Sequence, residues 1–382
     1  MLEFLTLKPE AFGLDISDLS LKIIKLKKRG KFFDLASFGE EKIKPGIIKK
    51  GEIKKEEALA KIIKAALIKV NGEKLKTKYV VASLPEEEAF LQVIQMPRMS
   101  EEDLKSAVIY EAENYIPLPI DQVYLDSQIV SPDYNQSPER SEGLRRTNVL
   151  RPDQFDVLIT ALPKKTVNPY LSVLKKSGLQ PLIFEIESQA ISRALIKDEV
   201  TNPPSLLIDL GATRTSFIIF SGYSLRFTSS IPISSQGFTE IISKALKINL
   251  SEAEKLKIEY GLQLGGKRGK EIFEALIPAL TDLIEQIKKH LIYYQSHASY
   301  EHLPLNGKGV KKILLSGGGA NLKRLPEFLS SALKIPVEVG NPWLNILADP
   351  SKGVSELPLE RAFCYTAALG LALRGIKENN YS

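Results

Sequence analysis

Two aspartates, each at the entrance of a short polar turn between apolar runs, are the side chains of this sequence best suited to chemistry. One of them, Asp209, precedes a turn that contains Gly211, Thr213 and Thr215. Glycine lets the backbone approach a ligand closely, and threonine hydroxyls with exposed N–H groups suit phosphate oxygens. A carboxylate there would repel phosphate unless a cation, usually Mg²⁺, lay between them. The turn therefore predicts a phosphate site with a bridging magnesium ion, although most turns of this composition bind nothing.

The other aspartate, Asp15, opens a similar turn in FGLDISDLSLKIIKL, residues 12–26. Both stretches have an apolar entry, a polar tip and an apolar exit, which is the pattern of two strands joined by a tight turn. Aligning Asp15 with Asp209 places Ser17 opposite Gly211. Two copies of one hairpin predict two similar lobes that face each other across a cleft, with an anion held by both turns.

A third element is the apolar run ILLS at residues 313–316, which leads into three glycines and a helical pattern through residue 333. Backbone N–H groups and a helix N-terminus favour a flat or anionic ligand there. An alternative reading is a dinucleotide site with Glu338, about 20 residues further on, as the ribose ligand. The G-x-G-x-x-G pattern of such a site fails at Leu322.

These three elements in this order resemble the actin-like ATPase superfamily. Further segments, among them PRMSEEDL, ENYIPLP, IFEIESQAISRAL and AEKLKIEYGL, resemble the PilM family of cytoplasmic type IV pilus assembly proteins, with FtsA division proteins as the nearest relatives outside it. The resemblance covers nearly the whole chain, and PRMSEEDL with ENYIPLP is its specific part, because generic actin-like ATPases lack them. It implies an α/β, actin-like (ribonuclease H-like) two-lobed ATPase fold with an inserted subdomain of the FtsA and PilM type.

The resemblance also implies the cofactors ATP and Mg²⁺ and a role for each site residue. Asp15 and Asp209 would hold magnesium through water, and Glu187 would orient the attacking water. Residues expected to bind the nucleotide are Ser17, Ser20, Lys22, Gly211, Thr213, Thr215, Glu254, Lys257, Gly317, Gly318, Gly319 and Asn321. Without the resemblance, two plainer interpretations remain. Glu187 could equally be a capping residue at a helix start, and Glu254 and Lys257 could form a surface ion pair.

Two observations limit the expected activity. The family usually has glycine at the position of Ser17, and a side chain there would reduce the room for a phosphate or strain a left-handed turn. With only Glu187 to orient water, any ATPase is expected to be slow. A sugar or acyl kinase on the same fold is the enzymatic alternative, but the sequence offers no candidate for its aspartate general base.

The expected partner is the N-terminal cytoplasmic peptide of PilN, which the family binds at the insertion, here residues 86–178. Near its helix this insertion carries thioethers and aromatic rings that suit an extended apolar peptide, or alternatively fill its own core: Met96, Met99, Tyr110, Tyr115 and Ile116. Contacts with other pilus assembly proteins are a further expectation, and self-association is left open. An FtsA-like division or filament protein is the remaining alternative.

Composition sets broader limits. The chain has 382 residues with 43% hydrophobic content, enough for more than one core, and one cysteine, Cys364, so it forms no internal disulfide. It shows no signal-peptide pattern and no apolar run near the roughly 18 residues of a spanning helix. Residues 1–80 carry a surplus of eight positive charges, whereas the rest of the chain is near −2. We therefore expect a cytoplasmic protein, and no nucleic-acid ligand, because the lysines alternate with glutamates and lack interleaved aromatic residues. The resemblance implies that partners hold the protein at the inner face of the membrane.

The predicted elements divide the chain into six segments. These are a first lobe core (1–85), the inserted subdomain (86–178), a return and inter-lobe connector (179–205), a second lobe core (206–238), its subdomain (239–308) and a final core with a return helix (309–382). Ser100 is expected to cap a helix, a capping box at 251–254 to open another, and a long helix to run over 271–297. The polar stretch 131–154 reads as a mobile hairpin loop.

Overall fold

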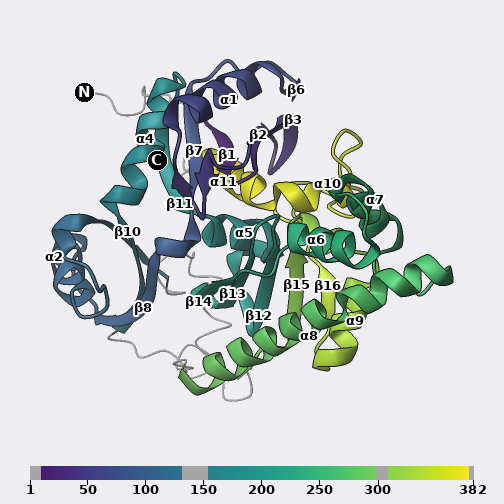
Figure 1. Cartoon of the computed structure of the whole chain (residues 1–382). Coiled ribbons are helices and arrows are strands. Elements are labelled where there is room, and N and C mark those ends of the chain that lie inside the picture. The colour runs from purple at the N-terminus through teal and green to yellow at the C-terminus, as the bar shows by residue number, and fades with distance from the viewer. Residues whose placement is uncertain (1–9, 131–153, 298–308, 378–382) are drawn as a thin grey trace. The chain divides into compact units, whose positions relative to one another are not determined.

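The computed structural model describes residues 10–130, 154–297 and 309–377 (Figure 1). The chain divides into two compact units. The first comprises Met1–Ala89, Leu162–Asp198 and Asn341–Ser382, and the second comprises Phe90–Ala161 and Glu199–Gly340. The first unit holds one large sheet, whereas the second holds a large sheet and a smaller one. The predicted loop over 131–154 lies outside the described residues except for Gln154.

The first unit has a six-stranded sheet in the order β11-β7-β1-β2-β3-β6. Strand β1 pairs with β2 as an antiparallel hairpin and with β7 in parallel, and β7 pairs with β11 in parallel. The strands are β1 (Phe12–Ile16), β2 (Ser20–Arg29), β3 (Phe32–Lys42), β6 (Asn71–Gly72), β7 (Tyr79–Leu84) and β11 (Gln180–Ile186), and a separate hairpin joins β4 (Ile48–Lys49) to β5 (Glu52–Ile53). The helices are α1 (Glu56–Ile68), η2 (Glu86–Glu88), α4 (Lys164–Lys176), α5 (Glu187–Leu195), α10 (Leu359–Ala362), η6 (Phe363–Tyr365) and α11 (Thr366–Lys377).

Glycine allows the last helix to pack closely on this sheet. A Cβ atom on Gly13 of β1 would lie 2.4 Å from the carbonyl oxygen of Ala368 in α11. A Cβ atom on Gly370 would lie 1.8 Å from the carbonyl oxygen of Ala190 in α5. No side chain fits at either place, so the backbones of α11, β1 and α5 meet directly. The C-terminal helix thereby becomes part of the first unit's core.

The second unit repeats the strand arrangement of the first. Its five-stranded sheet has the order β14-β13-β12-β15-β16, in which β12 pairs with β13 as an antiparallel hairpin and with β15 in parallel. The same neighbours in the same directions occur in β3-β2-β1-β7-β11. Its strands are β12 (Thr201–Leu210), β13 (Thr215–Gly222), β14 (Ser224–Ile231), β15 (Lys312–Ser316) and β16 (Val337–Val339). The duplicated hairpin that the sequence predicts is therefore present, with one aspartate near the end of each first strand.

Helices cover this second sheet because their apolar residues recur at the helical period. The longest, α8, buries Ile272, Leu276, Leu280, Leu283, Ile287, Leu291 and Tyr294, at spacings of three or four residues. The helices are α6 (Ser235–Leu246), α7 (Leu250–Tyr260), α8 (Gly266–His297), η5 (Gly318–Asn321) and α9 (Leu325–Leu333). None of the helices in the described part of the chain combines the length and apolar character needed to cross a bilayer.

The insertion forms a three-stranded sheet in the order β8-β10-β9, in which β8 and β10 are antiparallel. Its elements are β8 (Phe90–Pro97), α2 (Glu101–Ala112), η3 (Ile120–Gln122), β9 (Val123–Ile129) and β10 (Gln154–Pro163). Helix α4, which follows β10 directly, groups with the first unit, where Ser172 and Lys176 bond to Glu56 of α1. The predicted cap at Ser100 is confirmed, since its hydroxyl accepts the N–H of Asp103 at 3.1 Å.

Three predicted helix starts are wrong, and one of them is that of α8, which begins at Gly266 rather than at residue 271. Helix α7 is capped by Asn249, whose side-chain oxygen accepts the N–H of Glu252 at 2.9 Å, and Ser251 already lies inside the helix. Both residues are good caps, so composition alone did not separate them. After the three glycines the chain makes a 3₁₀ turn, and the α-helix begins only at Leu325. The N-terminus of α9 therefore does not follow the glycines directly.

Candidate functional site

The first aspartate turn places a buried carboxylate at the end of β1. Asp15 is 6% exposed and lies opposite Lys22 across the β1–β2 ladder. Its Oδ1 atom has no hydrogen-bond partner among the described residues. A buried carboxylate oxygen without a donor is costly, which points to a partner supplied by a ligand, a cation or water.

The turn after Asp15 does not require glycine. Ser17 has no left-handed backbone angle, and its N–H donates to the carbonyl of Ser20 at 2.9 Å. Its hydroxyl donates to the same carbonyl at 3.0 Å, and the ammonium of Lys22 donates to the Ser20 hydroxyl at 2.9 Å. The strain foreseen for a side chain at Ser17 is absent, because the serine fits the turn. A cation and two hydroxyls lie together beside the aspartate.

Parallel pairing brings a second acidic residue to the same edge of the sheet. Strands β1, β7 and β11 run in parallel, so their carboxyl ends meet at one edge. Glu187 follows β11 directly as the first residue of α5 and is half-buried. Burial, followed by the charges of Glu187, Asp18 and Asp15, raises the pKa of Tyr170. These three carboxylates therefore act on one tyrosine, and Tyr170 keeps its proton at neutral pH.

The second aspartate turn, in the other unit, is more fully bonded. Asp209 accepts the hydroxyl of Ser316 at 2.9 Å. Within the turn the N–H of Gly211 donates to the carbonyl of Arg214 at 2.9 Å. Thr213 is half-buried, whereas Thr215 is fully buried and its hydroxyl donates to the carbonyl of Ile233 at 2.7 Å. That hydroxyl holds the hairpin in place, and a phosphate contact from Thr215 stays a prediction.

The three glycines pack against this second turn. Gly317 has φ +79°, and a Cβ atom there would lie 2.9 Å from Asp209 Oδ1 and 2.7 Å from the carbonyl oxygen of Leu210. A Cβ atom on Gly319 would lie 2.3 Å from the Leu210 side chain. Gly318 and Asn321 are exposed. The structure therefore brings the predicted glycines and Asp209 together in one place, with no room for side chains at the first and third glycine.

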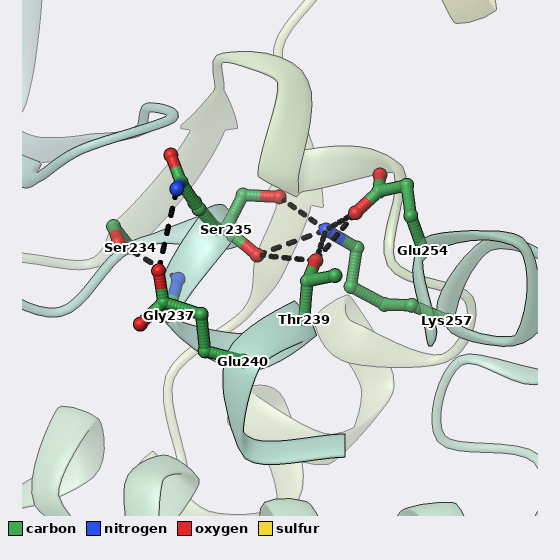
Figure 2. A network of polar contacts seen from close by, with 8 residues as sticks. Ser234, Ser235, Gly237, Thr239, Glu240, Glu254 and Lys257 are labelled. Atoms are coloured by element: carbon green, nitrogen blue, oxygen red, sulfur yellow. Dashed lines mark hydrogen bonds and ion pairs between the residues drawn. The ribbon is translucent and has the colours of Figure 1, made fainter. Parts of the chain in front are cut away.

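Glu254 and Lys257 belong to a polar network between α6 and α7, shown in Figure 2. The Lys257 ammonium lies 2.8 Å from Glu254 and donates to the carbonyl and hydroxyl of Ser235, both at 2.9 Å, and to the Thr239 hydroxyl at 2.8 Å. Thr239 also donates to Glu254. The side chain of Lys257 is 7% exposed. The three N–H bonds of the ammonium are thus already used, so an adenosine contact would have to displace one of these acceptors.

The electrostatics of this network follow from burial. Burial lowers the pKa of Lys257, and the ion pair with Glu254 offsets that only in part. Burial by itself would raise the pKa of Glu254, but hydrogen bonds from Lys257 and Thr239 lower it overall. The network is also bonded to the second turn, because the N–H of Ser235 donates to the carbonyl of Gly211 at 3.0 Å.

Sequence reasoning missed several residues that surround the two aspartate turns. Ser316 directly precedes the glycines, so its position was available as a signal. Asp18, whose carboxylate accepts two backbone N–H groups, and Glu86, which accepts the N–H of Ser188 at 3.2 Å, have partners far away in sequence. Glu338, proposed in the dinucleotide alternative, forms an ion pair with Lys312. Nothing in the sequence near Asp18 or Glu86 signals these contacts.

The residues present fit a nucleotide with magnesium. Asp15 offers an unpartnered oxygen, and no side chain fits at Gly317, where a Cβ atom would lie 2.9 Å from Asp209 Oδ1. Over residues 10–130, 154–297 and 309–377, no three His, Cys, Asp or Glu side chains gather as a metal-ligand set. Magnesium does not need such a set, since it keeps several waters and binds one or two carboxylates together with phosphates.

Solved structures support the fold. The chain is similar to the PilM-PilN type IV pilus biogenesis complex, with a TM-score of 0.75 and 27% identity over 96% of this chain and 98% of that chain. It is also similar to MreB5 of Spiroplasma citri bound to ADP, with a TM-score of 0.55 and 13% identity over 98% of both chains. The second likeness shows the fold alone. Together they confirm the α/β actin-like ATPase fold.

Sequence relatives agree. Cell division protein FtsA of Pseudomonas aeruginosa is 22% identical over 227 residues, covering 54% of this chain and 50% of that protein. FtsA of Buchnera aphidicola is 28% identical over 200 residues, covering 48% and 46%. The chain thus spans about half the length of the curated relatives it matches. The family model described as type IV pilus assembly protein PilM matches residues 13–376, nearly the whole chain. The chain therefore belongs to the PilM family of type IV pilus assembly proteins.

Proposed function

We propose that this protein is an ATP-binding scaffold of type IV pilus assembly that binds the N-terminal cytoplasmic peptide of a PilN partner. The observation that carries the nucleotide part is Asp15, a buried carboxylate with an unpartnered oxygen beside a turn of serines and a lysine. Magnesium would supply the missing partner of Asp15 and offset the charge of the phosphates. Similar actin-like proteins, MreB5 bound to ADP and to AMPPNP, make the ligand class plausible on fold grounds.

Each residue then has a defined task. Asp15 and Asp209 would hold the hydrated cation, while the Ser17 turn, Lys22 and the Thr213 turn would bind phosphates. Gly317, Gly318, Gly319 and Asn321 would line the adenosine face, together with Glu254 and Lys257. That one nucleotide touches residues of both units stays a prediction.

Nucleotide binding is tested by a calorimetric titration of the protein with ATP, in the presence and in the absence of Mg²⁺. Asp15→Asn and Asp209→Ala are expected to lose the gain in affinity that magnesium gives, with the fold intact. Asp126→Asn, which changes an exposed aspartate on β9, is the matched control and should bind as the wild type does. Unchanged magnesium dependence in both site variants would rule out the assignment.

Any hydrolysis is assigned to Glu187, which lies at the sheet edge of Asp15 and would orient the attacking water. Without a second general base the rate should be far below the median of roughly 10 s⁻¹ for enzymes. A phosphate-release assay on wild type and Glu187→Ala decides this point. Many turnovers per second, abolished in the variant, would show an enzyme rather than a scaffold.

The partner part rests on the insertion. Met96 and Ile116 lie in its core, whereas Tyr110 is 74% exposed and Tyr115 is 50% exposed. Ile109, next to Tyr110 on α2, is also exposed, and we call these three residues the aromatic surface. Exposed aromatic and aliphatic side chains on one short segment favour an apolar peptide, because single exposed apolar residues are common but several on one segment are not.

A peptide titration tests this surface. A double change of Tyr110→Ala and Tyr115→Ala should weaken binding of the PilN N-terminal peptide by at least 10-fold, a loss of about 1.4 kcal/mol. Tyr293→Ala on α8 removes a tyrosine of similar exposure and should leave binding unchanged. Equal affinity of both variants and the wild type would move the partner site elsewhere. Such binding would hold the protein at the inner membrane face.

A further inference from the structure

The first aspartate turn is tied to a distant turn by a buried carboxylate. Both carboxylate oxygens of Asp18 accept backbone N–H groups, from Lys50 at 3.0 Å and from Gly51 at 2.9 Å. Lys50 and Gly51 both have positive φ, 53° and 76°, so their two N–H groups can point at one anion. Asp18 is 8% exposed. We call the four residues 49–52, which join β4 to β5, the coupling turn.

The other side of the coupling turn binds the helix that leaves the insertion. The hydroxyl of Tyr170 donates to the carbonyl of Gly51 at 2.8 Å. Tyr170 is 1% exposed and lies in α4, which follows directly on β10, the central strand of the inserted sheet. The two backbone polar groups of Gly51 therefore bond to different partners, its N–H to the first aspartate turn and its carbonyl to the outgoing helix.

The incoming connection of the insertion reaches the same place. A Cβ atom on Gly51 would lie 2.4 Å from Cβ of Pro85, so the glycine packs directly against the residue that precedes η2. At the end of η2, Glu88 accepts the hydroxyl of Thr166 at 2.8 Å and lies 3.4 Å from the Lys165 ammonium. Both chain segments that lead to and from the inserted sheet are thus bonded to each other and contact the coupling turn.

From this geometry we infer that the coupling turn transmits the state of the first phosphate turn to the insertion, with Asp18 and Tyr170 as positioning residues. The inference rests on the proposed function, because it deepens the link between nucleotide and partner. A phosphate bound at Ser17 and Ser20 would contact residues one and two positions away from Asp18. Any shift of Asp18 moves two amides held by charge-assisted bonds, and the Gly51 carbonyl moves with them. A network with two arrangements that both ligands bias is what coupling between sites requires.

The experiment measures the affinity of the PilN N-terminal peptide with and without ATP and Mg²⁺, and the affinity of ATP with and without the peptide. For the wild type we expect the two ratios to be equal and about 5-fold or larger, within the usual range for coupled sites. Tyr170→Phe removes one hydroxyl and keeps the shape, and the ratio should fall to about 2-fold or less while each separate affinity changes little. Asp18→Asn should act in the same direction.

The control is Tyr365→Phe, which removes a hydroxyl from another buried tyrosine of the first unit, one that packs against Phe38. A structural role alone would lower the melting temperature of both tyrosine variants and leave the ratio untouched. The inference is overturned by an unchanged ratio in Tyr170→Phe, by equal effects of the two tyrosine variants, or by a wild type that binds both ligands independently. Absence of ATP binding would also overturn it, but that result marks failure of the proposed function.

Hydrogen exchange gives a readout that does not need the peptide. ATP with Mg²⁺ should slow exchange in the 47–55 segment and in the first half of α4 in the wild type. In Tyr170→Phe the protection of 47–55 should persist while that of α4 is lost. Protection of α4 that remains in this variant would contradict the assigned role of the hydroxyl.

Discussion

The glycine triplet allows a sharp prediction, because the structure treats its members differently. Gly317→Ala would place a Cβ atom 2.7 Å from the Leu210 carbonyl oxygen and 2.9 Å from Asp209 Oδ1, at φ +79°. The left-handed backbone costs about 1–2 kcal/mol for a residue with a side chain. Overpacking against backbone adds about 1–3 kcal/mol. We expect a total loss of about 2–5 kcal/mol, and displacement of Asp209 should also weaken magnesium-dependent ATP binding.

The assay is urea unfolding, with ATP titration in parallel. With an m-value of roughly 3 kcal/mol/M, this loss lowers the midpoint by about 0.7–1.7 M. Gly318→Ala is the matched control, since Gly318 is exposed and has no positive φ, and its midpoint should move little. Equal midpoints for the two variants would refute the reasoning. If Gly317→Ala is destabilised but its ATP binding keeps the normal magnesium dependence, the glycine loop does not position the metal site.

Three further changes test other parts of the structure. Arg193→Met leaves the buried carboxylate of Glu185 without its two 2.6 Å contacts and should cost about 3–5 kcal/mol of unfolding free energy, while the added change Glu185→Leu should recover most of it. Ser100→Ala removes the cap of α2 and should lower the stability of that helix by about 1 kcal/mol. The measurement is amide exchange, which should become faster in the first turn of α2. Burial would raise the pKa of Glu254, but hydrogen bonds such as that from Lys257 outweigh it and lower the pKa. The stabilisation that the ionised Glu254 carboxylate gives to the folded state is therefore present above pH 4.5 and lost as pH falls below it. The stability difference between wild type and Glu254→Gln should shrink over that range, and a constant difference in urea midpoint would contradict this sign.

Local sequence predicted the elements whose signals are local. The two aspartate hairpins were found because apolar strands, a polar tip and turn residues lie within about 15 residues of one another. The cap at Ser100 was found for the same reason. Where two good caps were neighbours, Asn249 and Ser251, the choice depended on the geometry of the preceding turn, and composition could not make it.

Tertiary contacts decided what the sequence left open. Met96 and Tyr110 looked alike as candidates for a peptide surface, but Met96 points from β8 into the core beneath α2 whereas Tyr110 lies on the outer face of that helix. The spacing of Glu254 and Lys257 predicted their ion pair and not its burial under α6, since Thr239 is 15 residues away from Glu254. Pairing across such separations is set by packing, which no local pattern encodes.

The two hairpins share a topology but differ in how their aspartates are satisfied, and this difference bears on function. Asp209 receives a hydroxyl from Ser316, whereas Asp15 has an oxygen with no donor among the described residues. An unpaired buried acceptor costs about 1–3 kcal/mol, and a chain selected only for stability would remove it with a serine such as the one beside Asp209. Proteins keep such defects where a ligand relieves them, so the imbalance is a reason to expect a bound cation at Asp15. Ser17 and Ser20 flank the same turn and Lys22 follows it on β2, which explains why phosphate is the anion that would accompany that cation.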